Sequence, residues 1–183
     1  MNKTLKLTLV LFLISAIVAG VLGVVNELTK DRIAEIAEQK TATAYAEVLD
    51  AAVYDDANYS GEDTQVQKVS VAKDASGNAL GYVVETVVTG SQGSITVIVG
   101  IDNDYKCTGI SITESSETSG LGAVASSPSD KGVAFRANFV GQGADLDLVK
   151  NGGTIEAITG ATITSNAVIS AVRAAATACE SLG

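Results

Sequence analysis

Near its beginning the chain has a run of nineteen residues without a single charge, Leu7–Val25, rich in Leu, Val and Ile. About twenty apolar residues are enough to cross a bilayer as one helix. Lys3 and Lys6 precede the run, and positive residues beside a span predict its cytoplasmic end. We therefore expect a single-pass anchor over residues 1–25 in the cell (inner) membrane. Its N-terminus would be cytoplasmic, and the rest of the chain would lie on the outer or periplasmic side.

A cleaved signal peptide is the alternative interpretation of this run. Ala19, Gly20 and Gly23 are small residues of the kind found near a cleavage point. The apolar run is longer than the core of an ordinary signal peptide, so we favour a retained anchor.

The remainder of the chain is acidic and lacks histidine. Residues 26–183 carry 10 basic and 21 acidic side chains, a net charge of −11. Such a surface repels nucleic acid, so we expect no nucleic-acid partner. With no histidine and only Cys107 and Cys179 as thiols, we expect no metal site. A disulfide between these two cysteines is the alternative, although we favour free thiols. Any redox chemistry would therefore come from a bound cofactor.

The pattern of apolar residues predicts an α+β fold, an antiparallel sheet with covering helices after the transmembrane helix. Residues 26 to about 52 have the periodicity of a stalk helix that packs on the domain, and residues 54–64 have the composition of a loop. Alternation between short turns predicts four consecutive strands, which would form a meander. The strands are expected over residues 66–72, 79–88, 94–101 and 106–113, and the helices over 130–140 and 166–182.

One short stretch near the end of the chain, residues 156–166, joins a turn to a helix. Gly160 and Ala161 carry almost no side chain and would let a bulky group approach the backbone, and Thr162 follows them directly. Thr164 and Ser165 are good N-cap residues for the helix. A helix start favours phosphate because its N–H groups are unpaired and carry a partial positive charge. The stretch could thus be an anion site with a hydroxyl pointed into it, or simply a set of helix caps.

A second polar stretch, residues 114–122, runs into Gly120-Leu121-Gly122 between the fourth strand and the next helix. Taken alone, it is also typical of a flexible surface loop. Its glycines would permit the close backbone approach that a flat ring needs.

Together the two stretches resemble motifs of the FMN-binding domains found in two membrane complexes. These are the G subunit of the Rnf electron-transport complex and the C subunit of the sodium-translocating NADH:quinone reductase. Thr159-Gly-Ala-Thr162, with Glu156 three positions upstream, is similar to the flavinylation motif. Glu117, Thr118 and Gly120–Gly122 match the second motif, in which Ser119 replaces a proline and Ser115 stands where many relatives have histidine. The length of the chain fits the Rnf protein better.

The resemblance implies covalent FMN, esterified through its phosphate to Thr162 by a flavin transferase. Leu121 would touch the flavin ring and Thr118 would hydrogen-bond its edge. The implied cofactor-binding residues are Thr162, Glu117, Thr118, Gly120, Leu121, Gly122, Thr159, Gly160, Ala161, Ile163 and Thr164. No residue of the chain is expected to be catalytic or to bind metal.

The implied organisation is an anchor at residues 1–25, a stalk helix and loop at 26–64 and an FMN-binding domain at 65–183. The implied function is electron relay beside other membrane subunits of an Rnf-type ferredoxin:NAD oxidoreductase coupled to sodium or proton translocation. Alternatives are a stand-alone flavoprotein of extracellular electron transfer, the related quinone-reductase protein, and a flavin-free adhesion or assembly domain.

Overall fold

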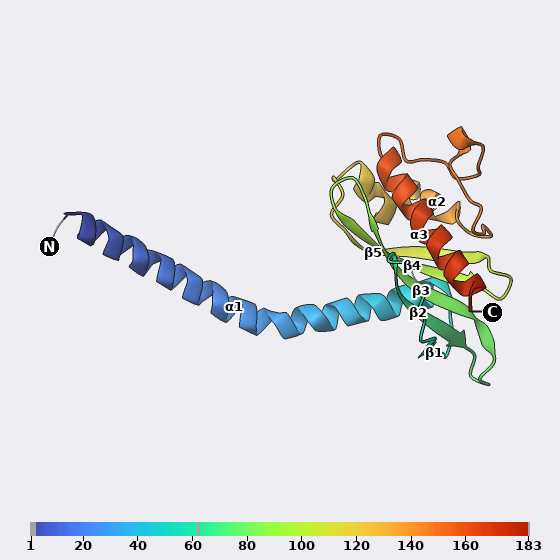
Figure 1. The fold of residues 1–183 in the computed structure, drawn as a ribbon, viewed down its shortest axis with the longest axis horizontal. Helices are drawn as coiled ribbons and strands as arrows, with labels where there is room; N and C mark the ends of the chain where they lie inside the picture. Colours follow the sequence, from blue (N-terminus) through green and yellow to red (C-terminus); the bar gives the residue numbers. More distant parts are fainter. Residues whose placement is uncertain (1–2, 62, 183) are drawn as a thin grey trace. The chain divides into compact units, whose positions relative to one another are not determined.

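The computed structural model describes residues 3–61 and 63–182. The ends of the expected anchor and domain (Met1, Asn2 and Gly183) and one residue of the expected loop (Glu62) lie outside this range. The chain folds as two compact units, Met1–Lys40 and Thr41–Gly183. Helix α1 (Lys3–Val48) supplies the described part of the first unit and enters the second with its last eight residues, from Thr41. The expected anchor and stalk are therefore one continuous helix (Figure 1).

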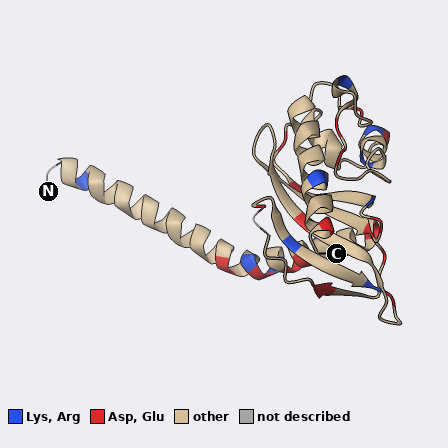
Figure 2. Ribbon diagram, turned by 45° about the vertical axis from the view of Figure 1, so that its right-hand side comes forward, with Lys and Arg blue, Asp and Glu red and all other residues tan. Residues whose placement is uncertain are grey.

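The first part of α1 is long and apolar enough to cross a membrane. Its most apolar window of 18 residues has a mean hydropathy of 2.7 and is entirely unburied within the protein. In Figure 2 this part of the helix is almost free of charge, whereas acidic and basic side chains follow it. An apolar surface that the described residues leave uncovered is stable in a bilayer, so the expected membrane helix is supported.

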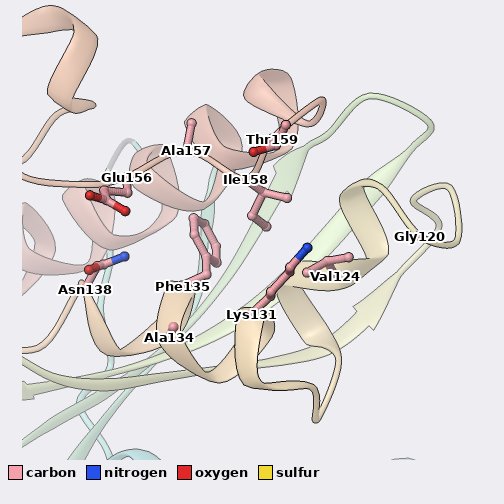
Figure 3. Close-up of a pocket in the computed structure, with 10 residues that line it drawn as sticks. All are labelled: Gly120, Val124, Lys131, Ala134, Phe135, Asn138, Glu156, Ala157, Ile158 and Thr159. Carbon is pink, nitrogen blue, oxygen red and sulfur yellow. The ribbon is translucent and has the colours of Figure 1, made fainter.

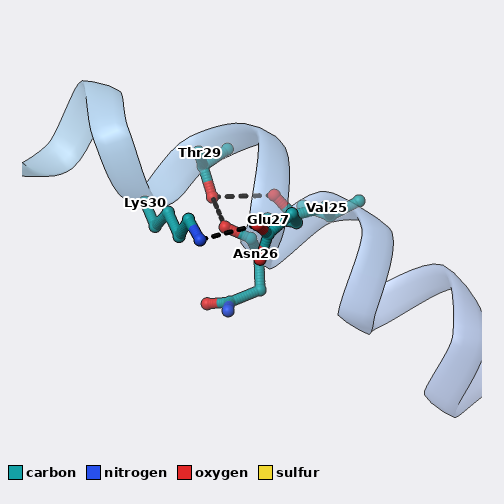
Figure 4. Close-up of polar contacts among 5 residues, drawn as sticks. All are labelled: Val25, Asn26, Glu27, Thr29 and Lys30. Atoms are coloured by element: carbon teal, nitrogen blue, oxygen red, sulfur yellow. Dashed lines mark hydrogen bonds and ion pairs between the residues drawn. The ribbon is translucent and has the colours of Figure 1, made fainter.

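The polar part of α1 begins directly after Val25 (Figure 4). The Thr29 hydroxyl donates to the carbonyl of Val25 at 2.8 Å, and Lys30 pairs with Glu27 at 2.6 Å. A hydroxyl bonded back to its own helix is satisfied without water. The ion pair, by contrast, is exposed and belongs in an aqueous or interfacial setting. The change from apolar to charged side chains thus occurs within about one turn of helix.

Helix α1 ends at Val48, earlier than the expected end near residue 52, because side chains of the second unit accommodate its last carbonyls. The Thr108 hydroxyl donates to the Val48 carbonyl at 2.6 Å, and the Tyr54 hydroxyl donates to the Leu49 carbonyl at 2.8 Å. The carbonyls at a helix end need partners from outside the helix. Here those partners fix the helix end to the sheet.

The second unit is built on an antiparallel sheet of five strands in the order β1-β2-β3-β4-β5. The strands are β1 (Val53–Asp56), β2 (Val66–Lys73), β3 (Ala79–Thr89), β4 (Ser94–Asp102) and β5 (Cys107–Ser115). The four expected strands and their meander are confirmed, each within a residue or two at its ends. The α+β class is likewise confirmed.

Strand β1 corrects the expected loop over residues 54–64. It is mostly exposed and has no alternating pattern, so its own sequence carried no strand signal. It forms because β2 offers a free edge, with Val53 opposite Lys73 and Asp56 opposite Ser70. The Lys73 ammonium also pairs with Asp55 at 2.8 Å.

Helices cover both faces of the sheet. On one face lies α3 (Thr162–Glu180), whose Val168 and Val172 are fully buried against strand residues such as Val84 and Val97. The other face receives the end of α1 in a smaller cluster of buried residues, Ala44, Tyr45, Val48, Ala72, Val83 and Ile98. Tyr45 also donates a hydrogen bond of 2.5 Å to Glu85.

The remaining helices lie between β5 and α3 in the chain. They are η1 (Gly122–Ser126), α2 (Asp130–Ala137) and η2 (Val149–Asn151). Helix α2 contacts η1 and β5, and its Phe135 stacks edge-on with Phe139 at a ring-centre distance of 5.3 Å. The expected helix over residues 130–140 is thus confirmed in a shorter form. The expected helix over 166–182 begins earlier, at Thr162, which changes the site described below.

Candidate functional site

The two stretches singled out in the sequence meet at one end of the sheet. A cavity of about 330 Å³, called the threonine pocket below, lies between them and the β3–β4 turn. It is lined by Ser91, Gln92, Glu117, Thr118, Leu121, Gly122, Gly160, Ala161, Thr162, Ile163 and Thr164. All the candidate cofactor-binding residues except Gly120 and Thr159 therefore line one cavity. Its volume falls at the lower end of the range of small-molecule sites, roughly 300–1,000 Å³.

Glu117 holds the three segments of the threonine pocket together. One carboxylate oxygen, Oε1, accepts from the backbone N–H groups of Ser91 at 2.7 Å and Gln92 at 3.0 Å. The other oxygen, Oε2, accepts from the Thr164 hydroxyl at 2.5 Å. Because both oxygens accept hydrogen bonds from other segments, Glu117 acts as a brace within the wall.

The same contacts determine the charge state of Glu117. Burial alone would raise the pKa of this carboxyl, but the hydrogen bonds from Thr164, Gln92 and Ser91 outweigh burial and lower its pKa. Bonds donated to a carboxylate favour its ionised form. The brace is therefore negatively charged at neutral pH.

Helix α3 starts without a side-chain cap. Its N-cap residue is Ala161, which makes no side-chain capping hydrogen bond. The expected roles of Thr164 and Ser165 as caps are wrong, because the helix begins before them. The N–H groups of the first turn therefore face the threonine pocket without a cap oxygen, in the arrangement that binds anions.

The hydroxyls around this helix start have different partners. Thr164 donates to Glu117, and Ser165 donates to the Ala161 carbonyl at 3.0 Å while accepting from the N–H of Ile158 at 3.0 Å. Thr159 and Thr162 make no side-chain hydrogen bond with any described residue. Only Thr162 of these two lines the threonine pocket, where it is partly exposed.

Two glycines shape the wall beside Thr162. Gly160 has a φ of +79°, a conformation that residues with a side chain rarely adopt, and a Cβ there would lie 3.2 Å from Leu121 Cδ2. At Gly122 a Cβ would lie 2.2 Å from Glu117 Oε2 and 2.6 Å from Thr164 Oγ1. Any side chain at this position would collide with the brace. Glycine therefore permits both the turn before Thr162 and the close approach of the second motif.

Gly120 and Thr159, the two candidates outside the threonine pocket, line a neighbouring cavity of about 330 Å³ (Figure 3). This cavity, called the α2 cavity below, is bounded by one face of α2 and by residues 156–159. Glu156, the acidic residue of the first motif, also lies here. The motif thus contributes to two adjacent cavities, with its attachment threonine in one and its acidic residue in the other.

Ser91 and Gln92 are pocket residues that the sequence did not identify as part of the site. The sequence predicts only a turn at this point, and turn residues of this kind occur in most hairpins. Their role depends on Glu117, which lies about 25 positions further along the chain and is brought to them by the sheet. No local pattern could have shown this contact.

The donor set of the second unit suits an organic anion. Among the described residues, no group of three or more His, Cys, Asp and Glu side chains is placed to hold a metal. Cys107 and Cys179 are free and buried, and burial raises the pKa of each thiol to about 12. Such thiols are inert at neutral pH. The features that fit FMN are the uncapped helix start for its phosphate, the glycine walls, and the exposed Leu121 and Ile163 at the rim.

Comparison with known proteins gives consistent matches over nearly the whole chain. Residues 90–177 match the family described as "FMN-binding domain", and residues 1–48 match the one described as "RnfG N-terminal region". The chain is 35% identical to the G subunit of an ion-translocating oxidoreductase complex from Methanosarcina acetivorans over 176 residues, which cover 93% of this chain and 91% of the relative.

Two further relatives extend the comparison to bacteria. The G subunit of the Na(+)-translocating ferredoxin:NAD(+) oxidoreductase complex of Acetobacterium woodii is 37% identical over 187 residues, covering 91% of this chain and 87% of the relative. The G subunit of the ion-translocating oxidoreductase complex of Salmonella typhi is 31% identical over 198 residues, covering 100% of this chain and 94% of the relative. The similarity therefore includes the long N-terminal helix as well as the second unit.

Proposed function

Since the chain belongs to the family of G subunits of ion-translocating oxidoreductase complexes and contains an FMN-binding domain, we propose that it carries FMN as a phosphoester on Thr162. It would serve as a membrane-anchored redox subunit that relays electrons within such a complex. When bound, FMN accepts and releases electrons, a chemistry that no side chain of the protein supplies.

The observation that carries this proposal is the position of the Thr162 hydroxyl. Of the four hydroxyls near the start of α3, it alone both lines the threonine pocket and lacks a hydrogen-bond partner among the described residues. It belongs to the first residue of a helix whose N-cap side chain makes no capping bond. A phosphate joined to it could face the partial positive charge of that helix start.

Other residues of the threonine pocket would position the cofactor. The backbone N–H groups of the first turn of α3 would bind the phosphate, and the glycine wall would let the ribityl chain lie against the backbone. Leu121 and Ile163, which are 46% and 61% exposed, would lose apolar surface to water by covering the ring. Glu117 would keep these parts at a fixed spacing through its three hydrogen bonds.

The remaining features of the proposal concern the surroundings of the protein. The N-terminus would lie in the cytoplasm and the domain on the outer side of the cell membrane, as Lys3 and Lys6 before the span favour. A flavin transferase would attach the cofactor, and the other membrane subunits of an Rnf-type complex would exchange electrons with it. Ferredoxin and NAD would be the terminal redox partners. Sodium or protons would be the transported ion, and the name of the Acetobacterium relative gives sodium for that protein.

The attachment is tested by co-expressing the full chain with a flavin transferase and viewing a denaturing gel under ultraviolet light. Wild type should give a fluorescent band and Thr162→Ala none, whereas Thr162→Ser should keep part of the signal because the hydroxyl is retained. Thr159→Ala is the matched control, since its hydroxyl is also unpaired but lies in the other cavity. A band that survives Thr162→Ala and disappears in Thr159→Ala or Thr164→Ala would place the ester elsewhere.

The orientation is tested separately by protease treatment of intact cells. Digestion of the second unit from outside, with the N-terminus protected, is the expected result. Protection of the whole chain until the membrane is permeabilised would reverse the orientation without affecting the flavin assignment.

A further inference from the structure

The Thr162 hydroxyl is not held in place by a hydrogen bond with any described residue. Its side chain is partly exposed in the threonine pocket. Without such a bond the side chain is free to exchange among its staggered rotamers, so the backbone alone determines where the hydroxyl can lie. The position of this hydroxyl therefore depends on whatever holds the backbone of residue 162.

The backbone directly before Thr162 forms a tight turn. The N–H of Ala161 donates to the carbonyl of Ile158 at 2.9 Å, which closes a four-residue turn. Gly160 stands at its third position with a φ of +79°, the positive value that one common class of turn requires there. The two central residues, Thr159 and Gly160, are exposed, whereas Ala161 is buried. The turn therefore projects from the surface and leads back into the core just before Thr162.

Ser165 fastens both ends of this turn to α3. Its hydroxyl accepts from the N–H of Ile158 at 3.0 Å and donates to the carbonyl of Ala161 at 3.0 Å. One hydroxyl is able to make both bonds because it is a donor and an acceptor. The Ser165 side chain is 0% exposed, so water cannot replace either bond. The turn cannot shift on the helix without leaving a buried polar group unpaired, which is costly.

One of these two bonds is ordinary for a serine in a helix, and the other is not. A helical serine often donates to the carbonyl four residues earlier, as Ser165 does to Ala161. The N–H of Ile158 lies seven residues earlier, outside α3, and its bond to Ser165 serves only the turn. In the same stretch the Thr164 hydroxyl is directed to Glu117 instead. Among the first hydroxyls of α3, Ser165 alone is bonded to the turn.

We propose that Ser165 is a positioning residue for flavin attachment, which holds the turn so that the Thr162 hydroxyl is presented correctly to the flavin transferase. This role rests on the proposed ester at Thr162. In that reaction the Thr162 oxygen bonds to the FMN phosphorus of a donor such as FAD. The phosphoanhydride bond of the donor breaks, AMP leaves, and the hydroxyl proton is lost to a base. Ser165 touches none of these atoms and acts through the backbone, where correct orientation of a nucleophile accelerates its reaction.

The rate of attachment tests this role. The full chain is purified without flavin in detergent and incubated with purified flavin transferase and FAD, and the covalent flavin is measured on denaturing gels. Ser165→Ala should lower kcat by about tenfold or more, because the turn is released. The KM for the chain should stay within about twofold, because a buried hydroxyl makes no contact with the transferase. An unchanged kcat, or a change in KM alone, would overturn the proposal.

Ser170→Ala is the matched control, because it removes a hydroxyl from the same helix away from the turn. The Ser170 hydroxyl donates to Gln65 at 2.9 Å and lines a different cavity from that of Thr162. A general loosening of α3 would slow attachment in both variants, whereas release of the turn would slow it only in Ser165→Ala. Circular dichroism is recorded at the assay temperature to show that each variant is folded. Equal slowing of the two variants would contradict a specific role for Ser165.

A second pair of variants isolates the hydroxyl from the effect of added bulk. Ser165→Thr keeps the hydroxyl and adds a methyl group, and Ser165→Val has nearly the same shape as threonine without the hydroxyl. Both variants introduce the same crowding at this buried position. Attachment should therefore be several-fold faster in Ser165→Thr than in Ser165→Val. Equal rates in the two variants would show that the hydroxyl does not position the turn.

The wild-type reaction distinguishes failure of this inference from failure of the proposed function. If fragmentation of the wild-type product finds no flavin on Thr162, the ester assignment itself is wrong. Flavin on Thr162 that is attached as fast in Ser165→Ala as in wild type would leave the ester assignment intact and refute only the role of Ser165.

Discussion

Helices α2 and α3 both belong to the second unit but begin in opposite ways. At α2, the Ser129 hydroxyl caps the helix by accepting from the N–H of Gly132 at 3.3 Å. At α3, the N-cap is Ala161, whose side chain cannot cap. The difference is not a shortage of hydroxyls, since Thr162, Thr164 and Ser165 all lie in the first turn of α3.

Helix α3 does not need the cap that α2 has. It is 19 residues long and buries a whole face against the sheet, whereas α2 has eight residues and buries only Gly132 and Phe135. Tertiary packing supplies most of the stability of such helices. The start of α3 can therefore keep its N–H groups available for a phosphate. A missing cap on a well-packed helix thus marks a candidate anion site when a pocket lies beside it.

Removing the carboxylate that accepts the hydrogen bond of the Thr164 hydroxyl should change the protein most. Glu117→Ala should cost about 3 kcal/mol of unfolding free energy, because a charged acceptor of three hydrogen bonds is lost and the buried Thr164 hydroxyl loses its partner. It should also reduce flavin attachment. Urea unfolding of the variant measures the first effect and gel fluorescence the second.

The matched control for this change is Glu114→Ala, which removes an exposed carboxylate from the end of the same strand, β5. Its unfolding free energy should stay within about 0.5 kcal/mol of wild type. Similar losses in the two variants would mean that Glu117 does not brace the threonine pocket.

Glycine substitutions in the second motif separate the effect of packing from that of backbone conformation. Gly122→Ala should cost about 2 kcal/mol, because its Cβ would overlap the bond between Glu117 and Thr164. Gly120→Ala should cost about 1 kcal/mol, because φ is +78° there but no atom lies within 4 Å of the added carbon. Thermal unfolding of both variants is the measurement. A larger loss of stability in Gly120→Ala than in Gly122→Ala would show that the motif is not closely packed against α3.

The caps themselves provide the next prediction. Ser129→Ala should lower the unfolding free energy by about 1 kcal/mol and leave flavin attachment unchanged, because it removes the cap of α2 and a hydrogen bond with Ser127 but nothing at the start of α3. Ala161→Asp should instead reduce attachment, since its carboxylate would compete with phosphate for the start of α3. Fluorescence intensity per mole of protein distinguishes the two. A loss of flavin in Ser129→Ala but not in Ala161→Asp would reverse the roles given to the two helix starts.

A dependence of stability on pH should be the weakest of these effects. The pKa of Glu117 lies below its ordinary value of 4.5 in the folded protein, so its contribution is complete above pH 4.5 and is lost as the pH falls through the lowered value. The difference in unfolding free energy between wild type and Glu117→Gln should therefore shrink as the solution is acidified below pH 4.5. A difference that grows on acidification would mean that the hydrogen bonds do not stabilise the charged form.

The regular parts of this fold were predictable because their signals are local. The uncharged run of α1 gives the length of a helix directly, and the alternation within β2 to β5 gives the two-residue period of strands. The positions of these elements are confirmed within a few residues. Strand β1 was missed because it depends on a free edge of β2 and not on its own exposed, acidic sequence.

The candidate site was only partly predictable for a related reason. Its motif residues follow from the sequence, and most of them do line one cavity. The start of α3 was misplaced because two consecutive cap-forming residues, Thr164 and Ser165, suggest a helix start that their contacts with Glu117 and the Ala161 carbonyl override. Contacts across the sheet, such as Glu117 with the β3–β4 turn, have no local signal.

Mass mapping of the purified wild-type chain decides whether FMN is esterified to Thr162. The intact protein should be heavier than its sequence by FMN less one water. After proteolysis and fragmentation, that increment should reside on Thr162 and on no other residue of the peptide that contains it. An intact mass equal to that of the bare sequence after co-expression with a flavin transferase, or an increment on Thr159, Thr164 or Ser165, would contradict the assignment.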